Sequence, residues 1–269
     1  MDSLYSVTGK TAIVTGGLGQ LGRQFCRALV ERGANVVCID KKIDDARARA
    51  AFGPHTDPMQ FLESDVTSRR SLEDALARIV DRFGAPEVLV NNAGLDSPPG
   101  APAADTGPFE DYPEESWDKV IDVNLKGVFL CCQVFGGAMA KAGRGSIVNI
   151  GSIYGIVSPD QRIYEFRRRN GEQFFKPVAY SASKSGVLNL TRYLATYWGG
   201  SGVRVNALTF AGVANNQPAE FLAGYCPKVP LGRMAREDEY NGAIVFLASS
   251  ASSYMTGSNM VLDGGFTAW

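Results

Sequence analysis

Apolar residues recur along the chain in two alternating forms, short continuous runs and longer segments with helical spacing. The short runs are rich in β-branched residues without polar alternation, which is typical of strands buried on both faces of a parallel sheet. The first run is followed by Leu21, Phe25 and Leu29 at helical spacing, and Gly33 then ends the predicted helix. The predicted strands are residues 11–15, 35–39, 59–63, 88–90, 146–150, 203–208 and 259–262.

The segments between these strands carry the helical pattern, so strands and helices alternate along the chain. The longer predicted helices are 71–83, 116–142, one that ends near Trp198, and 237–249. This alternation predicts an α/β fold of the Rossmann type, a doubly wound parallel sheet of seven strands with helices on both faces. No internal repeat or linker divides the sequence, so we expect one domain over residues 1–269.

Three segments break this pattern. Residues 95–113 are rich in Pro, Gly and Ala and are predicted to form an irregular loop above the carboxyl edge of the sheet. Residues 158–177 hold several arginines among aromatic residues, and residues 215–229 are expected to form a mobile lid. The first two are predicted insertions into the domain.

Composition and charge exclude several classes of function. Hydrophobic residues make up 45% and charged residues 20% of the 269 residues, which is ordinary for a globular protein with a sizeable core. The net charge of −1 gives no reason to expect nucleic acid or an anionic membrane as a partner. Residues 1–10 lack the features of a signal peptide, and no continuous apolar run approaches the roughly 18 residues that span a bilayer.

The cysteines and the single histidine narrow the chemistry further. The five cysteines form no Cys-x-x-Cys pair and lie mostly in apolar segments, so we expect them to be reduced in a cytoplasmic protein. His55 lies among Gly53, Pro54 and Asp57, which is loop composition. A Ser-His-Asp hydrolase is therefore not expected, and no metal site is predicted.

A glycine-rich turn follows the first predicted strand and opens a helix. Gly16, Gly19 and Gly22 stand around Gln20 and Leu21 in this turn. Glycines let the backbone approach a pyrophosphate, whose charge then faces the N-terminus of the helix. The turn therefore predicts a dinucleotide site.

Asp40 follows the second predicted strand, 24 residues after Gly16. An acid at this place would accept hydrogen bonds from the adenosine ribose hydroxyls and would repel a 2′-phosphate. We therefore predict NAD rather than NADP as the cofactor. The neighbouring Lys41 and Lys42 leave NADP as a less favoured alternative, although two lysines also suit a solvated turn.

Tyr180 and Lys184 lie four positions apart on a predicted helix and so project from one face. The ammonium is expected to lower the pKa of the phenol from its ordinary value of about 10 toward neutrality. Such a phenol is a general acid or base for an alcohol or a ketone. Tyr and Lys at this spacing also occur on many solvated helices, so the interpretation depends on the rest of the chain.

These features together resemble the short-chain dehydrogenase/reductase family. The matching motifs, in family order, are Thr15-Gly16, Asn91-Asn92-Ala93-Gly94, Asn124, Ser152, the Tyr180/Lys184 pair, Arg204-Val205-Asn206 and Asp263-Gly264-Gly265. The resemblance covers essentially the whole chain. It implies an oxidoreductase that transfers a hydride between a secondary alcohol or ketone and a nicotinamide.

The resemblance also implies roles for single residues. Tyr180 would be the catalytic acid/base, and Lys184 would lower its pKa and bind the nicotinamide ribose. Ser152 would hydrogen-bond the reacting oxygen, and Asn124 would hold a water that links Lys184 to solvent. The implied cofactor contacts are Gly16, Gly19, Gln20, Leu21, Asp40, Lys41, Asp65, Val66, Asn92, Ala93, Gly94, Tyr180, Lys184 and Val213.

Three departures from the family pattern bear on the site. Gln20 stands where the family's turn usually has its second glycine. Phe210-Ala211 replaces the usual Pro-Gly after the sixth strand, and Asn215 replaces a downstream Thr. The sequence therefore defines the residues that contact the nicotinamide end of the cofactor less well. The third departure is the long segment between Ser152 and Tyr180, which are 28 residues apart.

This extra length is the arginine-rich insertion 158–177, whose two ends are tethered beside the reacting centre. Arg162 and some of Arg167, Arg168 and Arg169 are candidates to bind an anionic group of the substrate. A solvated or subunit-contact loop is the alternative. The candidate substrate residues are Ser152, Tyr154, Arg162, Arg168, Tyr180 and Asn216.

Arg162-Ile163-Tyr164-Glu165 and Asn216-Gln217-Pro218 are similar to a subgroup associated with flagellin glycan modification and legionaminic-acid pathways. This similarity implies a sugar-like substrate. We therefore expect an NAD-dependent dehydrogenase of a sugar, polyol or hydroxy acid. A reductase of an apolar steroid or acyl-chain ketone would keep the same mechanism, and a non-catalytic dinucleotide sensor is the alternative of another class. The family resemblance also implies a homotetramer, and a monomer or a dimer is the alternative.

Overall fold

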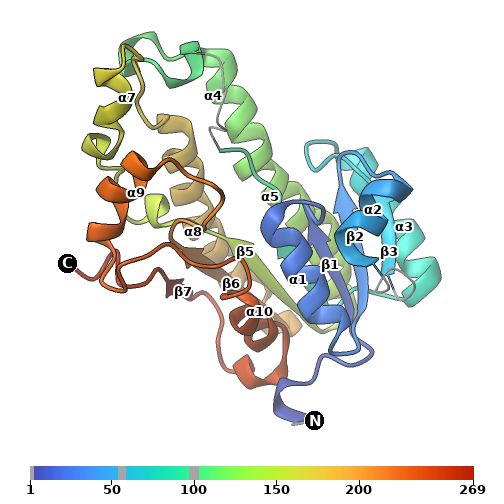
Figure 1. The fold of residues 1–269 in the computed structure, drawn as a ribbon. Coiled ribbons are helices and arrows are strands. Elements are labelled where there is room, and N and C mark those ends of the chain that lie inside the picture. The colour runs from blue at the N-terminus through green and yellow to red at the C-terminus, as the bar shows by residue number, and fades with distance from the viewer. Residues whose placement is uncertain (1–2, 54–58, 97–102) are drawn as a thin grey trace.

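The computed structural model describes residues 3–53, 59–96 and 103–269, and His55 lies outside them. In this part of the chain, seven parallel strands form one sheet in the order β3-β2-β1-β4-β5-β6-β7 (Figure 1). The doubly wound parallel fold predicted from the sequence is confirmed. The strands are β1 Thr11–Thr15, β2 Asn35–Asp40, β3 Met59–Glu63, β4 Val88–Asn91, β5 Gly145–Ile150, β6 Val203–Phe210 and β7 Asn259–Leu262.

The strand order reverses at the centre of the sheet, where β1 pairs with β2 on one side and with β4 on the other. The connections from these strands therefore leave in opposite directions. A reversal of this kind opens a crevice outside the carboxyl ends of the strands, and ligands of open α/β sheets bind there.

Helices cover both faces because successive residues of a strand point to opposite sides of the sheet. Ala12 and Val14 of β1 belong to an apolar cluster with α1 and α10, whereas Ile13 belongs to a second cluster with α3, α5 and α8. The helices are α1 Gln20–Val30, α2 Asp45–Phe52, α3 Arg69–Phe83, α4 Glu114–Ile121, α5 Gly127–Cys131, α6 Gly137–Ala142, α7 Glu165–Arg169, α8 Val178–Trp198, α9 Ala219–Tyr225 and α10 Asn241–Ala248.

One continuous helical run joins α4, α5 and α6 through two π-helical turns, Asp122–Lys126 and Cys132–Gly136. By length and hydropathy this run, Glu114–Ala142, could cross a membrane, but 56% of its apolar window is buried inside the protein. It packs against α8 and the sheet, as a core helix does. A π turn is frequent at functional sites, and the first one carries Asn124.

The last helix begins later than the sequence predicts. Residues 237–240 form a turn instead of the first turn of the predicted helix 237–249. The Glu239 carboxylate accepts hydrogen bonds from the backbone N–H of Arg236 and from the Arg233 guanidinium, each at 2.7 Å. These bonds hold the segment in a turn, and the helix starts at Asn241.

The two segments 158–177 and 215–229 contain short helices and pack on each other over one end of the sheet. The first holds a 3-10 turn, Gln161–Tyr164, and α7, and the second holds α9 (Figure 1). Ile163 and Tyr164 of the first share an apolar cluster with Tyr225 of the second. Tyr164 and Phe174 of the insertion are thus interior residues of this cluster.

Candidate active site

The glycine turn between β1 and α1 packs against the segment that follows β4. Gly16 has a φ of +62°, and a Cβ there would lie 2.9 Å from the Cα of Ala93. The Asn92 side-chain amide donates hydrogen bonds to the carbonyl oxygens of Thr15 and Gly16, each at 3.1 Å. A Cβ at Gly22 would lie 2.1 Å from the Gly16 carbonyl oxygen, so only glycine fits there. The turn therefore presents its backbone to the crevice.

Asp40 ends β2 on the wall of the same crevice. Its carboxylate accepts hydrogen bonds from the backbone N–H of Leu18 at 3.0 Å and of Lys41 at 2.9 Å. These bonds fix the acid beside the glycine turn. The Lys41 ammonium forms an ion pair with Asp65 at 3.0 Å, so this lysine is held by an acid on the same wall.

Asp65 and Val66 follow β3. Burial alone would raise the pKa of Asp65, but hydrogen bonds from Thr67 and the ion pair with Lys41 outweigh it and hold that pKa below its ordinary value. Val66 packs against Gly127, where a Cβ would lie 3.0 Å from the Val66 side chain. A charged carboxylate and an apolar side chain therefore lie next to each other on the wall of the crevice.

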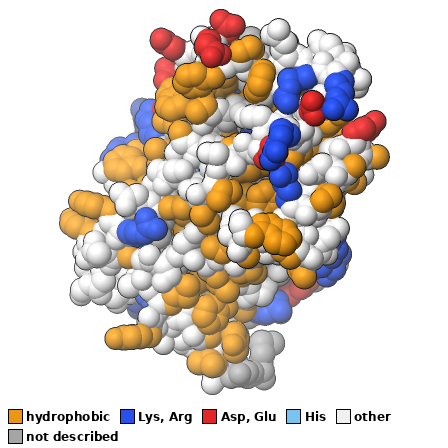
Figure 2. Space-filling model, turned by 90° about the vertical axis from the view of Figure 1, so that its left-hand side faces the viewer, with side chains coloured by type: hydrophobic (Ala, Val, Ile, Leu, Met, Phe, Trp, Pro, Cys, Tyr) orange, Lys and Arg blue, Asp and Glu red, His pale blue; other side chains and the backbone are white. Residues whose placement is uncertain are grey.

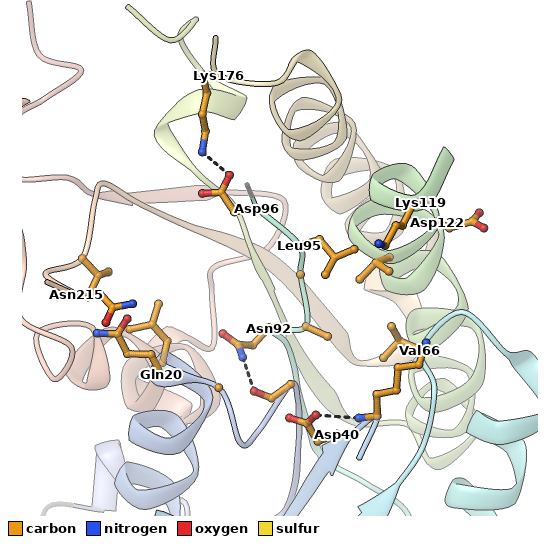
Figure 3. A pocket seen from close by; sticks show the side chains of 18 of the residues that line it. Gln20, Asp40, Val66, Asn92, Leu95, Asp96, Lys119, Asp122, Lys176 and Asn215 are labelled. Carbon is orange, nitrogen blue, oxygen red and sulfur yellow. Dashed lines mark hydrogen bonds and ion pairs between the residues drawn. The ribbon is translucent and has the colours of Figure 1, made fainter. Parts of the chain in front are cut away.

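The crevice is a cleft of about 1530 Å³ (Figure 3). Asp40 and Lys176 lie at opposite ends of it, with Asn92 between them. Its size exceeds the roughly 300–1,000 Å³ of ordinary small-molecule pockets, and a glycine backbone with an acid on its wall fits a dinucleotide. The cofactor residues from the sequence that line it are Gly16, Gly19, Gln20, Leu21, Asp40, Lys41, Asp65, Val66, Asn92, Ala93, Gly94 and Val213.

A smaller cavity of about 250 Å³ adjoins the cleft and is lined by Tyr180 and Ser152. Tyr180 lies in the first turn of α8, which starts after Pro177. Ser152 follows β5 and accepts a hydrogen bond from the backbone N–H of Tyr154 at 3.2 Å, which caps a short 3-10 turn. The Ser152 hydroxyl lies close enough to that of Tyr180 to lower its pKa. The two hydroxyls therefore meet at one wall of the cavity.

Lys184 is buried beside this cavity, one helical turn after Tyr180, and lines neither cavity itself. Its ammonium donates a hydrogen bond to the carbonyl oxygen of Ile150 at 2.8 Å and lies 5.9 Å from the centre of the Tyr180 ring. A Cβ at Gly94 would lie 3.7 Å from the same nitrogen. The ammonium thus lies where β5, α8 and the segment after β4 converge.

Asn124 fastens the segment after β4 to the long helical run. Its side-chain oxygen accepts a hydrogen bond from the Leu95 N–H at 2.7 Å, and its amide donates to the Leu95 carbonyl oxygen at 2.8 Å. The amide also donates to the Ser183 hydroxyl at 3.2 Å, which ties the pair to α8. Asn124 is fully buried, and the π turn directs it into this junction.

The surroundings shift the pKa values of Tyr180 and Lys184. Loss of water contact, together with the charge of Asp96, raises the pKa of Tyr180, and the neighbouring Ser152 hydroxyl opposes this rise only in part. Burial lowers the pKa of Lys184 to about 8. The shift predicted for Tyr180 had the opposite sign, because it counted the nearby ammonium and not the desolvation of the phenol. In the chain alone the phenol is therefore protonated at neutral pH.

Two of the predicted substrate residues lie in different cavities. Tyr154 lines the smaller cavity and is 8% exposed. Its hydroxyl lies near that of Tyr164 but makes no hydrogen bond of ordinary geometry in the described part of the chain. A buried hydroxyl of this kind favours a polar ligand beside it. Asn216 lines the larger cleft instead, with a φ of +55° that is uncommon for a residue other than glycine.

Arg162 and Arg168 line neither cavity, which corrects the prediction that they bind the substrate. The Arg162 side chain is 84% exposed and donates two hydrogen bonds to Asp160, each at 2.9 Å. Arg168 donates to the carbonyl oxygens of Phe174 and Gln161, each at 2.9 Å. On the face that carries α7 and α9, basic side chains gather with acidic ones among them (Figure 2). These two arginines hold the insertion together.

Asp96 and Lys176 are site residues that were not singled out from the sequence. They form an ion pair that lines both cavities, and the Lys176 ammonium lies 4.9 Å from the centre of the Tyr180 ring. The positions carried some signal, because Asp96 follows Asn92-Ala93-Gly94 closely and Lys176 precedes the helix of Tyr180. The ion pair between them could not be predicted, because it depends on the path of the insertion, and no periodicity in the sequence indicates that path.

Comparisons with known proteins agree with this geometry. A family model described as enoyl-(acyl carrier protein) reductase matches residues 16–267. The chain is 34% identical over 275 residues to a D-threitol dehydrogenase of Mycolicibacterium smegmatis, with 99% of this chain and 96% of that protein covered. It is 35% identical over 260 residues to a 3-alpha-(or 20-beta)-hydroxysteroid dehydrogenase of Mycobacterium bovis, with 97% and 90% covered.

The fold is also found among solved structures. A short chain dehydrogenase from Leptospira borgpetersenii with bound NAD⁺ matches with a TM-score of 0.85 at 32% sequence identity. The match covers 97% of this chain and 94% of that one. The similarity to this structure therefore covers nearly the whole chain.

Proposed function

Because the chain belongs to the short-chain dehydrogenase/reductase family, we propose that it interconverts a secondary alcohol and a ketone with NAD as cofactor. The observation that carries the proposal is the position of Tyr180. Its phenol lies beside Ser152 in a small cavity that adjoins a cleft of dinucleotide size. A proton-transferring hydroxyl between two such cavities suits hydride chemistry.

In alcohol oxidation, the ionised form of Tyr180 accepts the proton of the substrate hydroxyl, and Ser152 donates a hydrogen bond to the same oxygen. NAD, when bound, supplies the hydride acceptor. In the reverse direction Tyr180 donates its proton to the ketone oxygen. The raised pKa of Tyr180 suits this second role at neutral pH, and oxidation should be faster at alkaline pH.

Lys184 and Asn124 act on this centre through position. The buried Lys184 ammonium near the Tyr180 ring favours the ionised phenol, although desolvation outweighs it in the chain alone. Asn124 holds the Leu95 backbone against α8, and it is a candidate to place a water near Lys184. Both are positioning residues for Tyr180.

NAD is favoured over NADP by the acid at the end of β2. The Asp40 carboxylate, fixed by two backbone N–H groups, would accept ribose hydroxyls and repel a 2′-phosphate. Lys41 is paired with Asp65, which makes it a poor receptor for that phosphate. The bound NAD⁺ of the Leptospira relative supports the same choice.

The substrate is proposed to be a small sugar, polyol or hydroxy acid. The cavity of about 250 Å³ lies below the usual range of roughly 300–1,000 Å³ for ligand pockets, and it contains several hydroxyls. The D-threitol dehydrogenase relative supports a polyol. Arg162-Ile163-Tyr164-Glu165 is similar to the flagellin and legionaminic-acid subgroup. This similarity supports a sugar derivative as a further candidate substrate.

An apolar ketone such as a steroid is the second candidate. The hydroxysteroid dehydrogenase relative favours it, as do Phe210, Phe221 and Met234 on the cavity wall. The cavity is small for a fused ring system unless segment 215–229 opens. This segment lines both cavities through Gln217 and Phe221. We propose that it is a lid over the two cavities and that residues 1–269 form a single domain.

We also propose a cytoplasmic homotetramer. The exposed rings of Tyr193 and Tyr197 on α8 stack at 6.1 Å between ring centres and are 63% and 67% exposed. Leu231 and Trp269 near the C-terminus are 68% and 80% exposed. Exposed apolar groups of this kind on a long helix and at the C-terminus support subunit contacts there. The cysteines of the described residues are all free thiols, in keeping with a reducing compartment.

The proposal is tested by following NADH absorbance with a panel of polyols, sugars, hydroxy acids and hydroxysteroids at alkaline pH, with NAD and with NADP. We expect turnover of a small polyhydroxy alcohol with NAD. Turnover of steroids alone would move the substrate to the second candidate. Tight NAD binding in calorimetry without turnover of any alcohol would favour a dinucleotide sensor and contradict the enzyme.

A further inference from the structure

The ion pair between Asp96 and Lys176 lies where the two cavities meet. Asp96 comes from the segment after β4, which Asn124 fixes at Leu95, and Lys176 comes from the end of the insertion. Figure 3 shows the two side chains pointing toward each other across the upper end of the cleft. The Lys176 side chain is 8% exposed and that of Asp96 is 52% exposed, so the carboxylate is the member that faces solvent and ligands.

The insertion is built to hold Lys176 in place. The Lys176 N–H donates to the Gln161 side chain at 2.9 Å, and Arg168 donates to the Gln161 backbone carbonyl oxygen at 2.9 Å. The N–H of Phe175 donates to the carbonyl oxygen of Thr106 at 2.7 Å, which ties the insertion to the loop after β4. The arginine-rich segment thus brings Lys176 to the reacting centre. Of its arginines, Arg162, Arg168 and Arg169 line neither cavity, and Arg167 lines the cleft in an ion pair with Glu172.

The pair lies beside the reacting hydroxyl. The Lys176 ammonium is 4.9 Å from the centre of the Tyr180 ring. Burial raises the pKa of Tyr154 and of Tyr180, and the negative charge of Asp96 adds to the rise in both. Asp96, Lys176 and Tyr154 line the same cavity of about 250 Å³ as Tyr180, so a substituent of a substrate bound there would meet them.

These charges discriminate between neutral and anionic substrates. A substrate carboxylate at this place would face the Asp96 carboxylate, and Lys176 is already neutralised by its partner. Like charges at an interface cost binding free energy and so reject the wrong ligand. A neutral polyol meets no such cost, because its hydroxyls can donate charge-assisted hydrogen bonds to Asp96.

We propose that Asp96, held by Lys176, is the specificity-determining residue that selects a neutral polyhydroxy alcohol and rejects the corresponding hydroxy acid. This inference rests on the proposed function and narrows its substrate class. It replaces the prediction that Arg162 and Arg168 bind an anionic substrate.

The test compares substrates that differ only in a terminal carboxylate, D-threitol with D-threonate and galactitol with galactonate. The kcat and KM values of each are measured with saturating NAD for the unaltered chain and for Asp96→Asn, Lys176→Met and Arg169→Gln. Arg169→Gln removes a cation of the same insertion that lines neither cavity, and it serves as the matched control. Thermal unfolding verifies that each variant is folded.

Asp96→Asn should raise KM for the polyol about tenfold and lower KM for the acid by a similar factor, because Lys176 then faces the carboxylate. Lys176→Met should act in the opposite direction on the acid, since it leaves Asp96 without its counter-charge. Arg169→Gln should leave the polyol-to-acid preference unchanged.

An equal effect of Asp96→Asn on the two substrates of a pair would overturn the inference and leave the proposed function standing. So would a rise in acid turnover in Lys176→Met. If the unaltered chain oxidises no alcohol of the panel, the proposed function fails and this inference falls with it.

Discussion

Replacing Asn124 by Ala is the perturbation that best separates positioning from stability in this site. The side chain is fully buried and bridges both backbone groups of Leu95, at 2.7 Å and 2.8 Å. Its third bond, to Ser183, is longer, at 3.2 Å, and the Ser183 hydroxyl keeps a second bond to the Tyr180 carbonyl oxygen at 2.7 Å. The substitution therefore leaves chiefly the N–H and the carbonyl oxygen of Leu95 without a hydrogen-bond partner.

The magnitude follows from these two groups. Each buried backbone group left without a partner costs about 1–3 kcal/mol. Leu95 is only partly buried, so water restores part of that loss, and we expect unfolding to be easier by about 2–4 kcal/mol. A domain with about 5–15 kcal/mol of stability survives this change. The freed segment carries Asp96, and a shift of about 1 Å there can lower turnover by about a hundredfold.

Asn206→Ala is a matched control. Asn206 is also fully buried and bridges a loop in the same way, donating to the Met255 carbonyl oxygen at 2.8 Å and accepting from the Ser258 N–H at 3.1 Å. It lines neither cavity. Urea unfolding should report a similar loss of stability for Asn124→Ala and Asn206→Ala, whereas kcat should fall only in the first. Equal kcat values for the two variants would refute a positioning role of Asn124.

Three other predictions concern the cofactor and the buried lysine. Asp40→Ala should weaken NAD binding and improve NADP relative to NAD, as measured by calorimetry with both. Gly22→Ala should abolish cofactor binding and lower stability, because its Cβ would lie 2.1 Å from the Gly16 carbonyl oxygen; unchanged NAD affinity would contradict the close approach. Lys184→Met should end turnover yet be at least as stable as the unaltered chain at neutral pH. Burial lowers the pKa of Lys184 from 10.5 to about 8, so the unaltered chain should gain stability relative to this variant as pH rises from about 8 to about 10.5, which urea midpoints across that range would reveal.

The fold could be read from the sequence because its signals are local. Each strand is a short apolar run, and each glycine that matters, such as Gly16 and Gly22, stands where a strand turns into a helix. The start of the last helix was misplaced because the turn that delays it depends on Glu239 bonding to Arg233 and to the Arg236 backbone. Hydrogen bonds of this kind leave no periodic pattern in the sequence, so the sequence could not predict them.

The site could be read only in part. Tyr180 and Ser152 were recognised by a family pattern, and the structure brings their hydroxyls together. The sign of the pKa shift of Tyr180 was wrong, since desolvation depends on packing that a linear sequence does not display. The insertion misled in another way. Its arginines suggested an anion site by composition, whereas the chain path keeps Arg162 and Arg168 out of both cavities and brings Lys176 to Asp96.

The most direct test of the central claim is the turnover of Tyr180→Phe beside its affinity for NAD. A phenol that transfers the substrate proton contributes about 10²–10⁴-fold to the rate, so kcat should fall at least a hundredfold while the dissociation constant for NAD stays nearly unchanged. Tyr240→Phe, at a buried tyrosine that lines neither cavity, should leave both values as they are. If Tyr180→Phe keeps a kcat close to that of Tyr240→Phe, Tyr180 is not the acid/base and the dehydrogenase chemistry described here is wrong.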